Sequence, residues 1–263
     1  MSSEPTFEIN LRETFPHLVA APIVEAVIHW QARAGNWSSA EQLQPRLREL
    51  LPEYPECHAQ QLLEFHAEKV GDGSETRIRR DNWHGFRLVS EDRHSILQFT
   101  RDGVAFSRLT PYEKWDSFAA EAWRLWRMFA DIAQPSEVQR LGVRYINRII
   151  LRQLKEVREN LTSPPECLES VGLPTVGFLY QSQHAVPGKP YEVNVVRTIQ
   201  PPGPDKDDEL GLIVDVDVGT TRTLACQEAE LQGHLTVMHW LKNKVFFSLL
   251  SPEAIRRFEK GES

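Results

Sequence analysis

The fold is decided by the stretch RLGVRYINRIIL, residues 140–151. Its β-branched and aromatic residues predict a strand over 141–151. Successive side chains of a strand project from opposite faces, so we expect an arginine ladder on one face (Arg140, Arg144, Arg148 and Arg152). The opposite face would carry apolar side chains, namely Leu141, Val143, Tyr145, Ile149 and Leu151. One face therefore requires a hydrophobic cover, and the arginine face is expected to stay open.

Two long amphipathic segments can provide that cover. Residues 112–132 place apolar side chains at helical spacing before Pro135 (Trp115, Phe118, Ala122, Leu125, Trp126, Phe129 and Ile132). Residues 227–250 do the same with Leu231, Leu235, Met238 and Leu241. A helix must bury its apolar stripe, so both segments are expected to pack on the same face of a sheet.

The remaining segments predict strands that run together between helices. We expect strands at 22–30, 61–70, 85–90, 95–109, 141–151, 175–186, 191–200 and 211–220, with an Asp-Gly hairpin turn at 102–103. A short helix over 40–51 completes a β-α-β-β-β-α order that the second half repeats. This order predicts an α+β fold: a twisted, mainly antiparallel sheet with two long helices on one face. The predicted organisation is an N-terminal lead (1–20) and two α+β halves (21–135 and 136–263) of one pseudo-symmetric domain, an internal duplication inferred from element order alone.

Composition excludes several classes of protein. The 263 residues include 30 Lys and Arg and 37 Asp and Glu, a formal net charge of −7, and 41% are hydrophobic. No apolar run approaches the roughly 20 residues of a membrane-spanning helix. The polar N-terminus is unlike a secretion signal, and the three distant cysteines give no disulfide framework. We therefore expect a cytoplasmic protein that does not bind membranes and is not a general nucleic-acid coat protein.

Two strand motifs carry a resemblance to a known family. They are PIVEA at 22–26 and LGVRYINR at 141–148, with Tyr112 before a tryptophan-rich helix and a late strand at 213–218. On these motifs the chain resembles, over nearly its whole length, a sporadically distributed family of bacterial and archaeal proteins with no assigned activity. The patchy distribution of that family implies an association with mobile or defence-linked systems.

The arginine ladder is the strongest candidate binding feature. Arginine forks suit phosphate, carboxylate or a nucleic-acid backbone. We group Arg144 and Arg148 with Asn147 of the same segment as candidate ligand- or partner-binding residues. In the alternative interpretation, these arginines form a cross-strand salt lattice with acidic neighbours.

Asp215 and Asp217 are the second candidate feature, because they alternate with valine and point the same way. Two such carboxylates can hold a divalent metal for phosphoryl-transfer chemistry. Alternatively, they are the ion-pair partners of Arg144 and Arg148. No third acidic ligand or glycine-rich loop accompanies them, so we assign no metal ligand.

A second basic patch lies around residues 77–87. Arg79 and Arg87 alternate there with Trp83 and Phe86, a combination that can grip single-stranded nucleic acid by phosphate contacts and stacking. The alternative is a solvated hairpin whose aromatic side chains are packed.

These features predict a non-enzymatic binding or adaptor protein that uses a charged open sheet face. Its partner would be another protein or a second copy of the chain, with an anionic ligand or nucleic acid as further options. We predict no catalytic residue and no cofactor. One alternative is a metal-dependent enzyme acting on phosphate esters or nucleic acid through Asp215 and Asp217. A second alternative is a nucleic-acid binder without catalysis.

Overall fold

The computed structural model describes residues 7–70, 73–164, 172–202 and 209–261. For residues 62–70 and 73–82 it describes the backbone only. Within these ranges, no helix is long and apolar enough to cross a membrane.

One nine-stranded sheet forms the centre of the molecule. Its strand order is β2-β3-β4-β5-β1-β7-β10-β9-β8, and all neighbouring strands are antiparallel. The bounds are β1 Ile23–Gln31, β2 Glu56–Val70, β3 Gly73–Val89, β4 Ser95–Thr100, β5 Gly103–Leu109, β7 Arg140–Leu151, β8 Leu179–Ala185, β9 Tyr191–Gln200 and β10 Leu210–Thr220. Two short strands, β6 Glu137–Val138 and β11 Leu224–Ala225, pair separately. The two halves of the chain thus meet where β1 pairs with β7.

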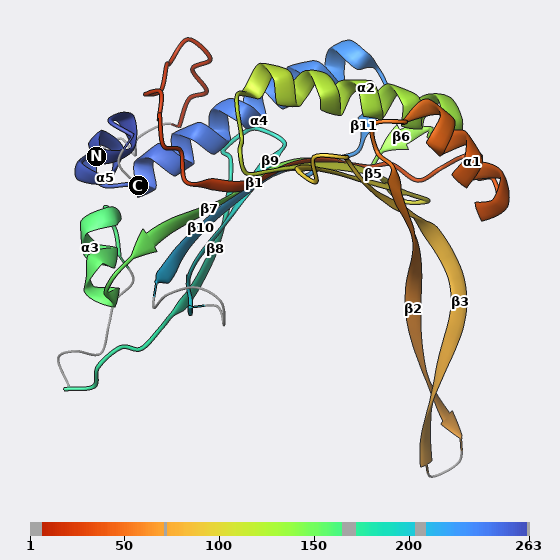
Figure 1. Ribbon diagram of the computed structural model, residues 1–263, viewed down its shortest axis with the longest axis horizontal. Coiled ribbons are helices and arrows are strands. Elements are labelled where there is room, and N and C mark those ends of the chain that lie inside the picture. Colours follow the sequence, from red (N-terminus) through yellow and green to blue (C-terminus); the bar gives the residue numbers. More distant parts are fainter. Residues whose placement is uncertain (1–6, 71–72, 165–171, 203–208, 262–263) are drawn as a thin grey trace.

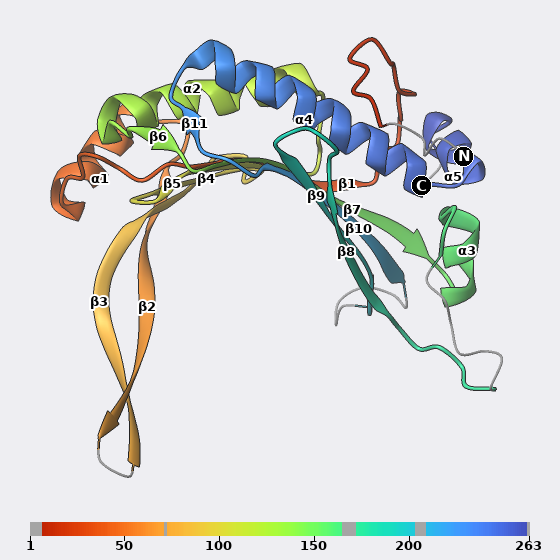
Figure 2. The same ribbon diagram turned by 180° about the vertical axis from the view of Figure 1, so that it is seen from behind.

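The helices lie on one side of this sheet. They are α1 Ala40–Leu50, α2 Trp115–Ala133, α3 Val157–Asn160, α4 Glu228–Leu249 and α5 Pro252–Glu259, and a short 3-10 helix spans Leu154–Glu156. Figures 1 and 2 show α2 and α4 lying along the convex side of an arched sheet, while the β2–β3 hairpin extends away on the other side. We call the uncovered concave side of the sheet the open face. The predicted α+β architecture, with two long helices on one face, is confirmed.

The core lies between the sheet and these two helices. Trp30 of β1 stacks on Trp126 of α2 with ring centroids 5.5 Å apart, and Phe99 of β4 meets Phe129 edge-on at 5.1 Å. The apolar side chains predicted for the covered face of β7 are buried there. Because these aromatic pairs join sheet and helix, they fix how α2 lies on the strands.

The strand pattern differs from the prediction in the first half. The predicted strand over 95–109 is two strands, β4 and β5, joined at the predicted Asp-Gly turn. Gly103 adopts a φ of 143°, and a Cβ there would lie 2.0 Å from the carbonyl oxygen of Trp30, so only glycine fits. Four strands therefore separate α1 from α2, and β3 is much longer than predicted. Element order does not establish an internal duplication, which stays a prediction.

Candidate functional site

The open face carries a lattice of charged side chains from β7 and β10. Arg144 binds Asp215 through two nitrogens, with Nε 2.9 Å from Oδ1 and Nη2 2.5 Å from Oδ2. Arg140 donates from Nη2 to Oδ2 of Asp217 at 2.8 Å. Asp215 is only 7% exposed, so Arg144 compensates a carboxylate that is largely removed from water.

Glycines make room for these arginines. A Cβ at Gly219 would lie 2.3 Å from Nη2 of Arg140, and a Cβ at Gly142 would lie 2.5 Å from its Nη1. A Cβ at Gly211 would lie 2.7 Å from Nε of Arg148. The guanidinium groups therefore lie directly over the backbone of the strands, and a larger residue at these positions would displace them.

The lattice interpretation of the arginine ladder explains most of these contacts. Arg144 pairs with Asp215 as that interpretation predicts, but the partner of Asp217 is Arg140 and not Arg148. Arg148 instead donates to Oε1 of Gln200, a neutral group, at 3.0 Å. Arg152 lies beyond the end of β7 and outside the lattice. Among the described residues, Arg148 is thus the ladder arginine of β7 that has no carboxylate partner.

The same contacts bear on the metal interpretation. Both carboxylates are engaged by arginines, which compete with a cation for the same oxygens. Within the described ranges, no group of three His, Cys, Asp or Glu side chains has metal-binding geometry. The donor set therefore gives the metal-dependent enzyme no support.

Burial and charge also shift the titration of groups on the open face. Burial raises the pKa of Asp217, and the adjacent Arg140 opposes that rise. Burial, assisted by the charge of Arg140, lowers the pKa of His29 on β1 to about 4. His29 is consequently neutral at pH 7 and adds no positive charge to this surface.

Asn147 does not belong to the open face. It has the same parity as Tyr145, so its side chain lies on the covered face of β7 and is buried. Its Nδ2 donates to the carbonyl oxygen of Val214 at 2.9 Å. Asn147 therefore does not share a face with Arg144 and Arg148, because adjacent residues of a strand face opposite sides. Its assignment as a binding residue stays a prediction.

The second basic patch is only partly described. Arg87 lies half-buried on β3 opposite Gln98, while the side chain of Arg79 lies outside the described residues. Trp83 stacks on Trp37 with centroids 5.5 Å apart, and Phe86 is buried in the core. These aromatic side chains are packed and not free for base stacking, which favours the solvated-hairpin interpretation.

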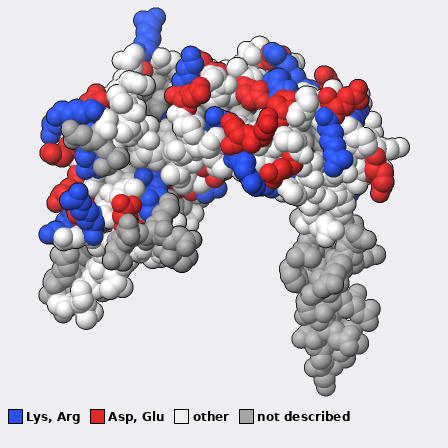
Figure 3. Space-filling model, in the orientation of Figure 1, with Lys and Arg blue, Asp and Glu red and all other residues white. Residues whose placement is uncertain are grey.

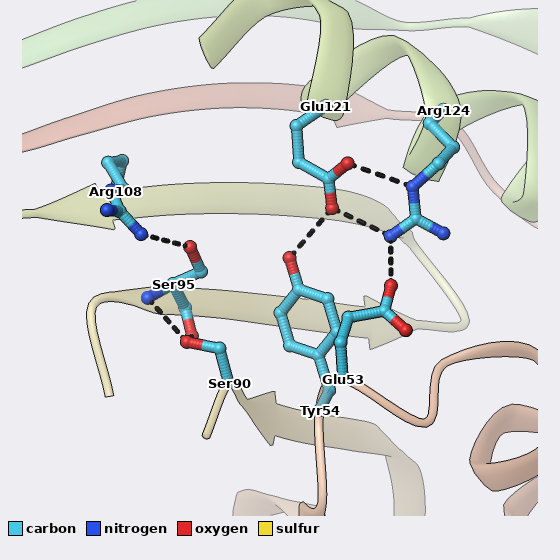
Figure 4. Close-up of polar contacts among 7 residues, drawn as sticks. All are labelled: Glu53, Tyr54, Ser90, Ser95, Arg108, Glu121 and Arg124. Atoms are coloured by element: carbon cyan, nitrogen blue, oxygen red, sulfur yellow. Dashed lines mark hydrogen bonds and ion pairs between the residues drawn. The ribbon is translucent and has the colours of Figure 1, made fainter. Parts of the chain in front are cut away.

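A polar network on the helix side of the sheet is fully paired. Figure 4 shows Tyr54 donating to Glu121, while Arg124 bridges Glu121 and Glu53. Nearby, Nη1 of Arg108 donates to the hydroxyl of Ser95 at 2.9 Å. Each charge in this network has an opposite partner or a hydrogen bond, so we assign it to stabilising the contact between α2 and the neighbouring loop.

One cavity among the described residues was not predicted from the sequence. It has a volume of about 840 Å³ and lies between the N-terminal segment, the start of α2, the covered face of β7 and α4. Its apolar walls include Phe15, Trp115, Trp240, Phe246 and Phe247. Phe15 stacks on Phe247 at 5.4 Å, which holds the N-terminal segment against α4. We call this space the α4 cavity.

Lys242 is the distinctive polar group of the α4 cavity. It lies in the lining and is 7% exposed. Its Nζ lies 3.7 Å from the centre of the Tyr145 ring and donates to Oδ1 of Asn243 at 2.6 Å. No carboxylate among the described residues forms an ion pair with it, and burial lowers the pKa of Lys242 to about 7.

The other titratable groups around this cavity do not compensate the ammonium group. Glu13 of the N-terminal segment already pairs with Lys244 at 2.6 Å. His239, one turn before Lys242, stacks on Trp115, and burial lowers its pKa to about 3, so it is neutral. The remaining titratable lining residues are His17, Glu113, Lys114, Tyr112 and Tyr145.

Two tyrosine hydroxyls complete the polar part of this wall. The hydroxyls of Tyr112 and Tyr145 are 2.7 Å apart, and burial raises the pKa of Tyr112 to about 12. Two hydroxyls carry two protons and share one hydrogen bond, so one proton remains available to an acceptor.

A sequence signal for this site exists in α4. Lys242 follows Leu235 by seven residues and Met238 by four, so helical spacing places it within the apolar stripe. A lysine at such a position is expected to be buried. The contribution of the N-terminal segment to the cavity, by contrast, has no local sequence signal.

Comparisons with known proteins return no relative. No protein-family model matches the chain, and no significant match is found among curated proteins or among solved structures. The family resemblance of the strand motifs therefore stays a prediction, and the function must be argued from the site.

Proposed function

We propose that the protein is a non-enzymatic binding or adaptor protein whose open sheet face docks another protein. The observation that carries this proposal is Arg148, which lies on the open face without an acidic partner among the described residues. A rigid charged lattice surrounds it, so the surface is organised before a partner arrives. A partner that presents a carboxylate to Arg148 would complete the lattice.

The balance of charge favours a protein over a nucleic acid. The described charged side chains of the open face are Arg87, Arg140, Arg144, Arg148, Glu25, Glu56, Glu192, Asp215 and Asp217. Four of these groups are positive and five are negative, whereas nucleic-acid interfaces have an excess of positive charge. Figure 3 shows blue and red side chains interspersed over the described part of one side of the molecule.

Site-specific photocrosslinking in cells tests this proposal. A benzophenone amino acid is placed at Ile213 on the open face, next to Arg148 in the β7–β10 register, or at Gln232 on the exposed side of α4 as control. We expect a discrete protein adduct from position 213 that is absent from position 232. The adduct should weaken at least fivefold with Arg148→Glu and persist with Arg152→Glu, which lies outside the lattice.

Other outcomes would refute the proposal. Equal labelling from both positions would mean that the open face has no specific partner. A nuclease-sensitive adduct would assign the face to nucleic acid, and an adduct with twice the mass of the chain would assign it to a second copy.

A further inference from the structure

We propose that the α4 cavity binds a small organic monocarboxylic acid with an aromatic or aliphatic body, and that Lys242 receives its carboxylate. This site is separate from the open face, because it lies on the opposite side of the sheet. It therefore does not depend on the proposed function.

The size and walls of the cavity define the body of the ligand. A volume of about 840 Å³ lies within the range of small-molecule sites. Aromatic rings form much of its lining, from the N-terminal segment (Phe15), the start of α2 (Trp115) and α4 (Trp240 and Phe246). Such walls favour a ligand with an apolar body, either a flat aromatic ring or an aliphatic chain.

Charge defines the head group of the ligand. Lys242 is almost fully buried, and a buried charge is unfavourable unless it is paired. Asn243 and the Tyr145 ring supply a neutral hydrogen bond and a cation–π contact, but no opposite charge. A carboxylate in the cavity would supply that charge, and the free hydroxyl proton of the Tyr112–Tyr145 pair can bind its second oxygen.

The number of cations favours a monoanion. Lys242 is the one buried cation of the described lining, since Lys114 lies at its exposed rim. A phosphate group carries up to two negative charges and more acceptor oxygens than this wall can serve. The carboxylate of a small organic acid matches one ammonium and one hydroxyl donor.

A matched set of acids and amides provides the test. The probes are benzoate, 4-phenylbutyrate and octanoate, each compared with its neutral primary amide, and binding is measured by calorimetry with the full chain at pH 6.5. We expect at least one acid to bind at least tenfold more tightly than its amide. The fluorescence of Trp115 and Trp240 gives an independent signal, because both line the cavity.

The variants locate the effect at Lys242. In Lys242→Met the acid and its amide should bind with equal affinity, while Lys155→Met, which removes an exposed lysine, should keep the preference. Lys242→Arg retains the charge and is expected to retain the preference for the acid. A variant that binds in this way is folded, so the loss of the preference in Lys242→Met would be due to the missing charge. The proposal is overturned if no acid binds below 10 mM, if acids and amides bind equally to the unmodified protein, or if the preference survives Lys242→Met.

Discussion

Replacing Lys242 by methionine should remove one component of the pH dependence of stability. Burial lowers the pKa of this lysine from 10.5 to about 7 in the folded protein. Between these values the unfolded chain holds one proton more than the folded chain at this position. The free energy of unfolding therefore rises with pH, by about 1.4 kcal/mol per pH unit.

The size of the effect follows from the two pKa values. Between pH 7.5 and 9.5, the contribution of Lys242 to stability increases by roughly 2–3 kcal/mol. Lys242→Met abolishes this component, since methionine fills similar space without a charge. Losing the Asn243 hydrogen bond and the Tyr145 contact shifts stability at every pH, but it does not change the slope.

Denaturant unfolding followed by tryptophan fluorescence at several pH values measures this difference directly. Groups that do not interact with Lys242 are present in both proteins and cancel in the comparison. Burial, assisted by the charge of Lys242, lowers the pKa of His239 to about 3, but His239 titrates below the pH range of 7.5–9.5 in which the two proteins are compared. Lys155→Met is the control, because an exposed lysine has no burial to relieve. Parallel stability curves for the unmodified protein and Lys242→Met would refute the argument that a buried, uncompensated lysine lines the α4 cavity.

Three further predictions concern the open face, and the first is compared with a substitution in α4. Gly219→Ala would push the Arg140 guanidinium off Asp217 and should cost about 1–2 kcal/mol in thermal unfolding. Gly233→Ala in α4 has open space around its Cβ and should stabilise the protein by about 0.5–1 kcal/mol. If both substitutions changed the free energy of unfolding in the same direction, the argument that Gly219 makes room for Arg140 would be contradicted. Arg144→Ala leaves Asp215 unpaired and should cost about 1–3 kcal/mol, most of which Asp215→Asn restores in the double variant; additive losses in a double-mutant cycle would show that the pair is not coupled. The neutral folded state of His29, with a pKa of about 4 against 6.5 when unfolded, should make stability fall by about 1.4 kcal/mol per pH unit from pH 6.5 towards 4. His29→Gln should flatten that fall, and unchanged acid titrations of stability would count against burial of His29.

The sequence was sufficient for the architecture, because local periodicity specifies it. The stripe of 112–132 and the alternation of 141–151 predict which faces must be covered. In the structure α2 packs on β5 and β1, and α4 packs on β7. The same alternation places Arg144 and Asp215 on one face. Alternation cannot specify the register of two strands. In the β7–β10 register, the backbone of Asp217 lies opposite Arg144, but the carboxylate of Asp217 binds Arg140.

The α4 cavity depends on contacts between segments far apart in the chain. Glu13 reaches Lys244, and Phe15 reaches Phe247, across more than 200 residues. Residues 1–20 have no periodicity from which such contacts follow, so the sequence predicted only a weakly structured lead. Lys242 could have been recognised from its place in the apolar stripe of α4, but the space it faces could not.

Strand β7 separates the two proposed sites, which gives a last prediction. Asn147 and Arg148 are neighbours in sequence, yet Asn147 lines the α4 cavity and Arg148 lies on the open face. Asn147→Asp adds a carboxylate to the wall that Lys242 shares, so it should cancel the preference for acids over amides. Asn147→Asp also removes the hydrogen bond from Asn147 to the carbonyl oxygen of Val214, which should lower the free energy of unfolding by about 1–3 kcal/mol. Photocrosslinking from position 213 should persist in this variant. Arg148→Glu should have the opposite pattern, with weakened crosslinking and an unchanged preference for acids. If either substitution abolished both activities in a folded protein, the two faces of β7 would form one functional unit, and the assignment of separate sites would be wrong.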